Sequence, residues 1–157
     1  MQQTDLIKLK SVLMNQSGLD LAWARNLLET EIVSASSSWG TPIMLKGLAI
    51  ALYLHGAVED ASLIWRAKMS NYDCFTSLDV EFLAGAGYDV TISYLKTQNL
   101  ETLPSVYIET QGGQTCWDML SYMISCADAG DFTHRDPAYI TGYLNRALDL
   151  IDELKSE

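Results

Sequence analysis

The sequence predicts an all-α fold of about seven or eight helices, arranged as antiparallel helical hairpins that stack as a degenerate repeat or an irregular bundle. Three observations predict this class. Apolar residues recur at spacings of three and four along most of the chain, glycine-containing turns separate these segments, and strand candidates are few, with no hairpin dipeptide such as Asn-Gly. A chain of 157 residues has the length of one ordinary domain, so we expect a single α-helical domain over residues 1–157.

The first two predicted helices form a hairpin. Leu6, Leu9 and Leu13 mark one face of the first helix, which ends in turn residues. The second helix runs from Asp20 to about Ser34, with apolar residues at helical spacing. A short connection between two such helices places them antiparallel.

A loop and a third helix follow. Four serines and a glycine make residues 34–40 the clearest loop. Thr41 and Pro42 are typical of an N-cap followed by proline at the first helical position. We therefore expect a helix from Pro42 to about His55, which contains the longest apolar run of the chain.

Two segments in the middle of the chain share one pattern. A helix ending at Gly56 is followed by acids that open the next helix, and a helix over residues 78–84 is followed by Gly85, Gly87 and Asp89 in the same way. Gly56 and Gly87 are 31 residues apart, close to the ~34-residue period of tetratricopeptide-type helix pairs. The resemblance is one of architecture, because no consensus of a repeat family is present.

The last third predicts two more helices and one ambiguous segment. Residues 104–111 fit a short helix, although Val-Tyr-Ile at 106–108 also has strand propensity. A helical stripe begins at Trp117 and ends near Gly130. Asp136 and Pro137 then open the last helix, with a cap and a proline at its first position.

The net charge of −10 is concentrated in the middle of the chain. Residues 1–68 hold six acids and six bases, whereas residues 69–134 hold nine acids and a single base, Lys96. Such a field repels nucleic acid and anionic membranes, so we expect neither as a partner. The partner that this charge favours is a basic protein or a cation.

The N-terminus and the cysteines favour a cytoplasmic location. The first residues lack the basic cluster and the apolar run of a signal peptide, and no apolar run is long enough to cross a bilayer. The three cysteines are odd in number and lack close pairing, which is typical of reduced thiols.

One candidate enzymatic site centres on Cys116. If Cys116 lies at the start of a helix after a glycine turn, the helix N-terminus would stabilise its thiolate, and His134 and Asp136 could act as base and orienting group. Residues 113–117, Gly-Gln-Thr-Cys-Trp, resemble the Gly-Gln-Cys-Trp around the nucleophile of transglutaminases, with Thr115 inserted. In those enzymes the histidine and the aspartate lie on strands far downstream. The alternative is that Cys116 is an inert, buried helical residue.

No metal or cofactor site is expected. The two histidines and three cysteines lack the spacings of zinc or helix-borne metal sites, and the phosphate-binding glycine motifs are absent. Asp128, Asp131 and Asp136 do not match a calcium-binding loop, and we interpret them as caps and solvated loop residues.

The acidic stretch suggests a function. Residues 97–134 contain no lysine or arginine, which is explained either by solubility or by a face that docks on a basic protein. For docking, we expect five acids to make electrostatic contacts and two aromatics to act as anchors. These candidate partner-binding residues are Glu101, Glu109, Asp118, Asp128 and Asp131, with Tyr107 and Trp39.

The leading hypothesis is therefore a non-enzymatic interaction domain. A small, acidic, helical chain of this kind resembles in general style the bacterial immunity proteins that neutralise basic toxins such as nucleases. Two alternatives remain open: a self-assembling helical scaffold, which would form a homodimer, and a thiol enzyme that uses Cys116.

Overall fold

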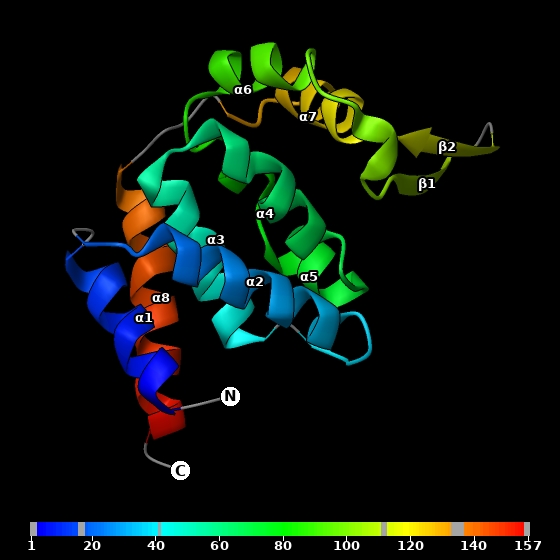
Figure 1. Cartoon of the computed structure of the whole chain (residues 1–157). Helices are drawn as coiled ribbons and strands as arrows, with labels where there is room; N and C mark the ends of the chain where they lie inside the picture. The colour runs from blue at the N-terminus through cyan, green and yellow to red at the C-terminus, as the bar shows by residue number, and fades with distance from the viewer. Residues whose placement is uncertain (1–2, 16–17, 41, 111–112, 133–136, 156–157) are drawn as a thin grey trace.

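The computed structural model describes residues 3–15, 18–40, 42–110, 113–132 and 137–155, and these residues form helices with one small sheet (Figure 1). This confirms the predicted all-α class. The elements in chain order are α1 (Gln3–Asn15), α2 (Leu21–Ala35), α3 (Ile43–His55), η1 (Val58–Asp60), α4 (Ala61–Lys68), α5 (Tyr72–Ser77), η2 (Val80–Ala84), α6 (Tyr88–Leu95), η3 (Leu100–Thr102), β1 (Val106–Thr110), β2 (Gly113–Trp117), α7 (Met119–Asp128) and α8 (Pro137–Lys155).

Helix α3 lies at the centre of the molecule. Nine of its 13 residues are buried, so it has no polar face. A helix that is apolar all round has to be covered on all sides. Helices α1, α2, α4 and α8 pack against it, and Figure 1 shows α1 and α8 side by side.

Ion pairs join the elements around α3. The guanidinium of Arg25 in α2 donates to both carboxylate oxygens of Asp60, at 2.6 and 3.1 Å, and Asp60 is only 3% exposed. Arg66 in α4 binds Glu29 in α2 through two hydrogen bonds of 2.6 Å. Bidentate arginine–carboxylate contacts of this kind fix the position of one helix relative to the other.

The two glycine turns of the predicted repeat pack against each other. Gly56 ends α3 with a positive φ of 77°, and a Cβ on Gly85 would lie 2.5 Å from the carbonyl oxygen of Tyr53 in α3. The second unit is nevertheless no copy of the first. Residues 80–84 form the short 3₁₀ helix η2, where the sequence predicted an α-helix. The arrangement is therefore an irregular bundle.

The structure corrects the prediction for residues 104–117. Residues 106–110 and 113–117 form two antiparallel strands, in which Val106 pairs with Trp117 and Tyr107 with Cys116. The strand propensity of the Val-Tyr-Ile segment outweighs the helix option, and paired strands then place Thr115 to Trp117 in β2 rather than in a helix. Helix α7 accordingly begins at Met119, with Asp118 as its N-cap.

The helix starts marked by proline are close to those predicted. Helix α8 begins at Pro137, as expected, whereas its expected cap, Asp136, lies outside the described residues. Pro42 occupies the N-cap position of α3 rather than its first turn, and Thr41 also lies outside the described residues. Within the described ranges, no helix combines the length and the apolar composition that a membrane span needs.

The close approach at Gly85 predicts a large effect of a small substitution. Gly85→Ala would press its Cβ into the backbone of Tyr53, which cannot rotate away, so we expect the free energy of unfolding to fall by about 1–3 kcal/mol. Gly142→Ala in α8 is the control, because its Cβ meets no atom within 4 Å. This control should raise the stability by about 1 kcal/mol. Urea unfolding measures both, and equal effects would contradict the packing at Gly85.

Candidate protein-binding surface

A groove lies between α5 and β1, on the acidic half of the molecule. It encloses about 480 Å³, and its lining is mostly aromatic and apolar. We call it the aromatic groove; it is lined by Met69, Asn71, Tyr72, Phe75, Val106, Tyr107 and Glu109.

Asn71 fixes the α5 side of the groove. Its side-chain oxygen accepts a hydrogen bond from the backbone N–H of Cys74 and so caps α5, a role for which asparagine is favoured. Its side-chain nitrogen donates to the carbonyl oxygens of Ala35 and Gly40, each at 3.0 Å. Gly40 in turn donates its backbone N–H to Asp73 at 2.6 Å. The loop between α2 and α3 is thereby held against the start of α5.

Tryptophan Trp65 fixes the β1 side. Its indole nitrogen donates to the carbonyl oxygen of Pro104 at 2.7 Å, two residues before the strand. Trp65 is fully buried and packs against Tyr122 of α7, which also contacts Phe75 of α5. Helices α4, α5 and α7 therefore hold the base of the hairpin in place.

Two of the expected binding residues line the aromatic groove. Tyr107 and Glu109 are alternate residues of β1 and so project from the same face of the strand. Tyr107 is 64% exposed. Tyr72 of α5, which the sequence analysis did not single out, lines the same groove and is 77% exposed.

The other expected residues lie in three further places. Glu101 and Asp118 line a second hollow of about 500 Å³, together with Lys96. Asp128 ends α7 and Asp131 follows it, both exposed. Trp39 is 97% exposed in the loop that Asn71 anchors. The acids thus do not form one cluster.

Asp118 has a structural role as well. Its carboxylate accepts hydrogen bonds from the backbone N–H and the hydroxyl of Ser121, at 2.7 and 2.9 Å, and so caps α7. The sequence predicts only a contact role for Asp118, because the helical stripe begins at Trp117, before this residue. A carboxylate at a helix N-terminus contributes about 1 kcal/mol to stability, so substitutions of Asp118 mix binding and folding effects.

The two halves of the chain use their charges differently. Lys8, Lys10, Arg25 and Arg66 each form an ion pair, with Asp20, Asp152, Asp60 and Glu29 respectively. By contrast, six acids between residues 89 and 131 are exposed and form no ion pair with any described residue. They are Asp89, Glu101, Glu109, Asp118, Asp128 and Asp131.

A buried lysine contacts Phe75, one of the residues that line the groove. Lys68 is 3% exposed, and its ammonium donates to the carbonyl oxygens of Phe75 and Leu78 at 2.5 and 2.6 Å, at the C-terminal end of α5. It also lies 4.5 Å from the centre of the Phe75 ring. Burial lowers the pKa of Lys68 to about 8 and raises the pKa of Tyr122 and of the Cys126 thiol nearby. Lys68 thus holds α5, and with it Phe75, in position.

The structure corrects the basis of the thiol-enzyme hypothesis. Cys116 is exposed on β2, so it neither lies in a helix nor is buried. The helix N-terminus that would stabilise its thiolate is therefore missing at this position. His134 and Asp136 lie outside the described residues. Among the residues that are described, no group of three histidines, cysteines or acids is arranged to hold a metal ion.

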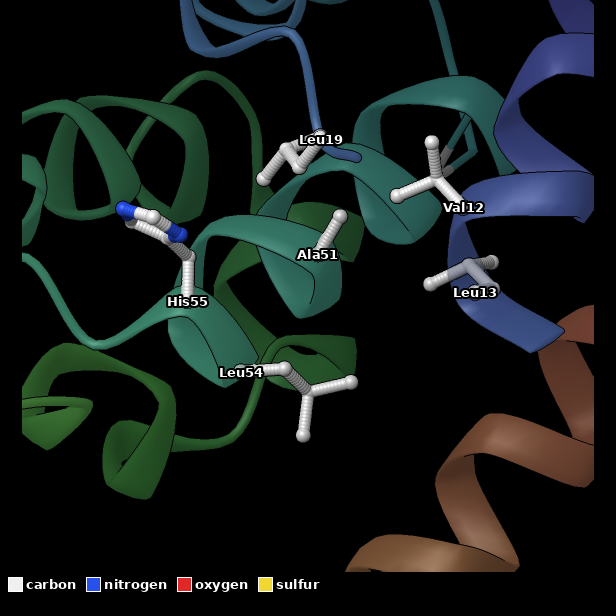
Figure 2. Close-up of a pocket in the computed structure, with 6 residues that line it drawn as sticks. All are labelled: Val12, Leu13, Leu19, Ala51, Leu54 and His55. Atoms are coloured by element: carbon white, nitrogen blue, oxygen red, sulfur yellow. The ribbon is translucent and has the colours of Figure 1, made fainter. Parts of the chain in front are cut away.

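The pocket around His55 is too small for a ligand. Figure 2 shows that Val12 and Leu13 of α1, Leu19, and three residues of α3 surround it. Its volume is about 20 Å³. Because a single water requires roughly 10–15 Å³ of such space, this pocket holds one water at most.

The chain shows no significant similarity to any protein-family model, curated protein or solved structure.

The buried lysine predicts how stability depends on pH. The folded-state pKa of Lys68, about 8, is below its ordinary value of 10.5, so between these values the unfolded chain binds the proton more tightly. Stability should therefore rise with pH, by about 2 kcal/mol between pH 7 and pH 10 relative to Lys68→Met, which cannot titrate. Urea unfolding of both proteins tests this, and a difference that stays constant with pH would show that Lys68 is not buried as a titrating group.

Proposed function

We propose that this protein is a non-enzymatic helical interaction domain that binds a basic protein through its acidic half, α5 to α7. The observation that carries the proposal is the contrast in charge use. Four bases of the N-terminal half are neutralised within the molecule, whereas six exposed acids of the other half have no ion-pair partner among the described residues. Uncompensated charge of one sign attracts a partner of the other sign and raises the rate of encounter.

Exposed aromatic side chains support the same proposal. Among the described residues, Trp39, Tyr72 and Tyr107 are some of the most exposed large hydrophobic side chains. Tyrosine and tryptophan are the residues most enriched among those that dominate binding energy at protein interfaces. Their position beside the anchored loop and the aromatic groove gives the acidic half fixed points of contact.

The finer proposal is that the partner is a basic toxin or nuclease that this domain inhibits, as immunity proteins do. Enzymes that act on nucleic acid bind phosphates with lysine and arginine. An acidic surface can occupy the same basic cleft and exclude the substrate.

Charge reversal tests the proposal. We expect wild type to capture a basic protein from the lysate of the source organism, and high salt to weaken the capture. Glu101→Lys combined with Glu109→Lys should abolish it, because both acids lie on the acidic half. Retention of the partner on the beads, identified by mass spectrometry, is the measurement.

A matched variant makes the test specific. Glu59→Lys combined with Asp149→Lys changes the net charge equally, but at exposed positions outside the acidic half, and should bind as wild type does. If both variants lost the partner equally, the capture would depend on net charge and not on the acidic half. Capture that is indifferent to salt and to both variants would contradict the proposal. A doubled mass of the purified protein in ultracentrifugation would favour the homodimer alternative instead.

A further inference from the structure

We infer that the aromatic groove between α5 and β1 binds the side chain of an arginine, presented by the basic partner. The inference rests on the proposed function and makes it specific, because it assigns one site and one side chain. Two observations support it: the groove is lined mainly by aromatic side chains, and Asn71 is already hydrogen-bonded whereas Glu109 is not.

The walls of the groove suit a flat, weakly hydrated group. Tyr72 and Tyr107 are largely exposed and line it together, with Phe75 also in the lining. Met69 and Val106 add apolar surface. Aromatic faces attract cations, and guanidinium stacks on them better than ammonium does because it is planar and less strongly hydrated.

The polar groups of the groove select for a cation. Asn71 is already bonded through both its side-chain oxygen and its side-chain nitrogen. Among the described residues of the lining, Glu109 alone is charged, and its carboxylate has no hydrogen bond or ion pair with any described residue. A carboxylate beside aromatic faces matches guanidinium, which donates two parallel hydrogen bonds to a carboxylate.

The second hollow lacks this selectivity. Glu101 and Asp118 are accompanied there by Lys96, whose charge opposes a cation, and the carboxylate of Asp118 is held by Ser121. The position of Trp39 is a further reason to place the arginine site in the aromatic groove and not in the second hollow. Asn71, which lines the groove, donates to the carbonyl oxygens of Ser38 and Gly40 on either side of Trp39, so the loop that carries this exposed residue is attached to the groove wall.

The experiment is an NMR titration of the ¹⁵N-labelled protein with the peptide acetyl-Gly-Arg-Gly-Arg-Gly-amide. We expect the largest shifts of backbone amides at residues 69–75 and 106–109, where the groove is lined. The same peptide with lysine should bind several-fold more weakly, and the peptide with uncharged citrulline should not bind measurably. Glu109→Gln should weaken the arginine peptide about tenfold, because a charge-assisted pair is lost.

A matched control locates the effect. Glu59→Gln removes the same charge from an exposed site in η1, outside both the groove lining and the acidic half, and should bind as wild type does. Tyr72→Ala and Tyr107→Ala should each weaken binding without altering the net charge. These two variants separate stacking in the groove from general attraction between charges.

Three results would overturn the inference. They are the absence of any shift with the arginine peptide, shifts centred on Lys96, Glu101 and Asp118, or equal binding of the lysine peptide. Each of these leaves the proposed function standing if the acidic half still captures a basic protein. Failure of that capture defeats the proposed function itself, so the two outcomes are distinguishable.

Discussion

The structure depends on the burial of α3. Its 13 residues include nine that are buried, and none of its faces is polar enough to meet water. The chain therefore surrounds it with α1, α2, α4 and α8. Gly47 admits α1 at close range, since a Cβ at this position would lie 2.6 Å from a methyl carbon of Leu9. The burial of apolar area on this scale is the main favourable term in folding, and the ion pairs of Arg25 and Arg66 set the register around it.

Elements beyond this bundle are attached by a few strong contacts. Trp65 bonds to Pro104, Lys68 holds the end of α5, and Tyr122 packs against both Trp65 and Phe75. Because the core does not require their outer faces, α5 to α7 can carry exposed aromatics and unpaired acids. The helices packed around α3 therefore contribute most of the buried apolar core, whereas α5 to α7 carry the exposed aromatic residues and acids.

Local signals in the sequence were sufficient for much of the fold. The apolar run of α3, the proline at the start of α8 and the loop at 34–40 are encoded within a few residues, so periodicity and turn chemistry predict them. The hairpin was missed because Val-Tyr-Ile at 106–108 fits either state until its partner strand is known. Residues 80–84 form a 3₁₀ helix next to the turn at Gly85, which packs against α3, and a tertiary contact of this kind is not encoded in local periodicity.

The candidate site was only partly predictable for the same reason. The sequence predicts Glu109 as a binding residue from its charge and Tyr107 from its aromatic ring. Tyr72 precedes Tyr107 by 35 residues in the sequence, and only the fold brings the two to the same groove. Nor could the sequence show that both side-chain polar atoms of Asn71 are hydrogen-bonded whereas the Glu109 carboxylate has no partner among the described residues, which is the difference from which we infer an arginine site.

The central claim is that the exposed acids of α5 to α7 serve binding and not folding. The most direct test is urea unfolding, at low ionic strength, of a variant that carries Glu101→Gln, Glu109→Gln, Asp128→Asn and Asp131→Asn. Asp118 is kept because it caps α7. The account predicts a free energy of unfolding equal to or above that of wild type, because repulsion between like charges is relieved. A loss of about 2 kcal/mol or more, typical of removing groups that stabilise the native state, would contradict it.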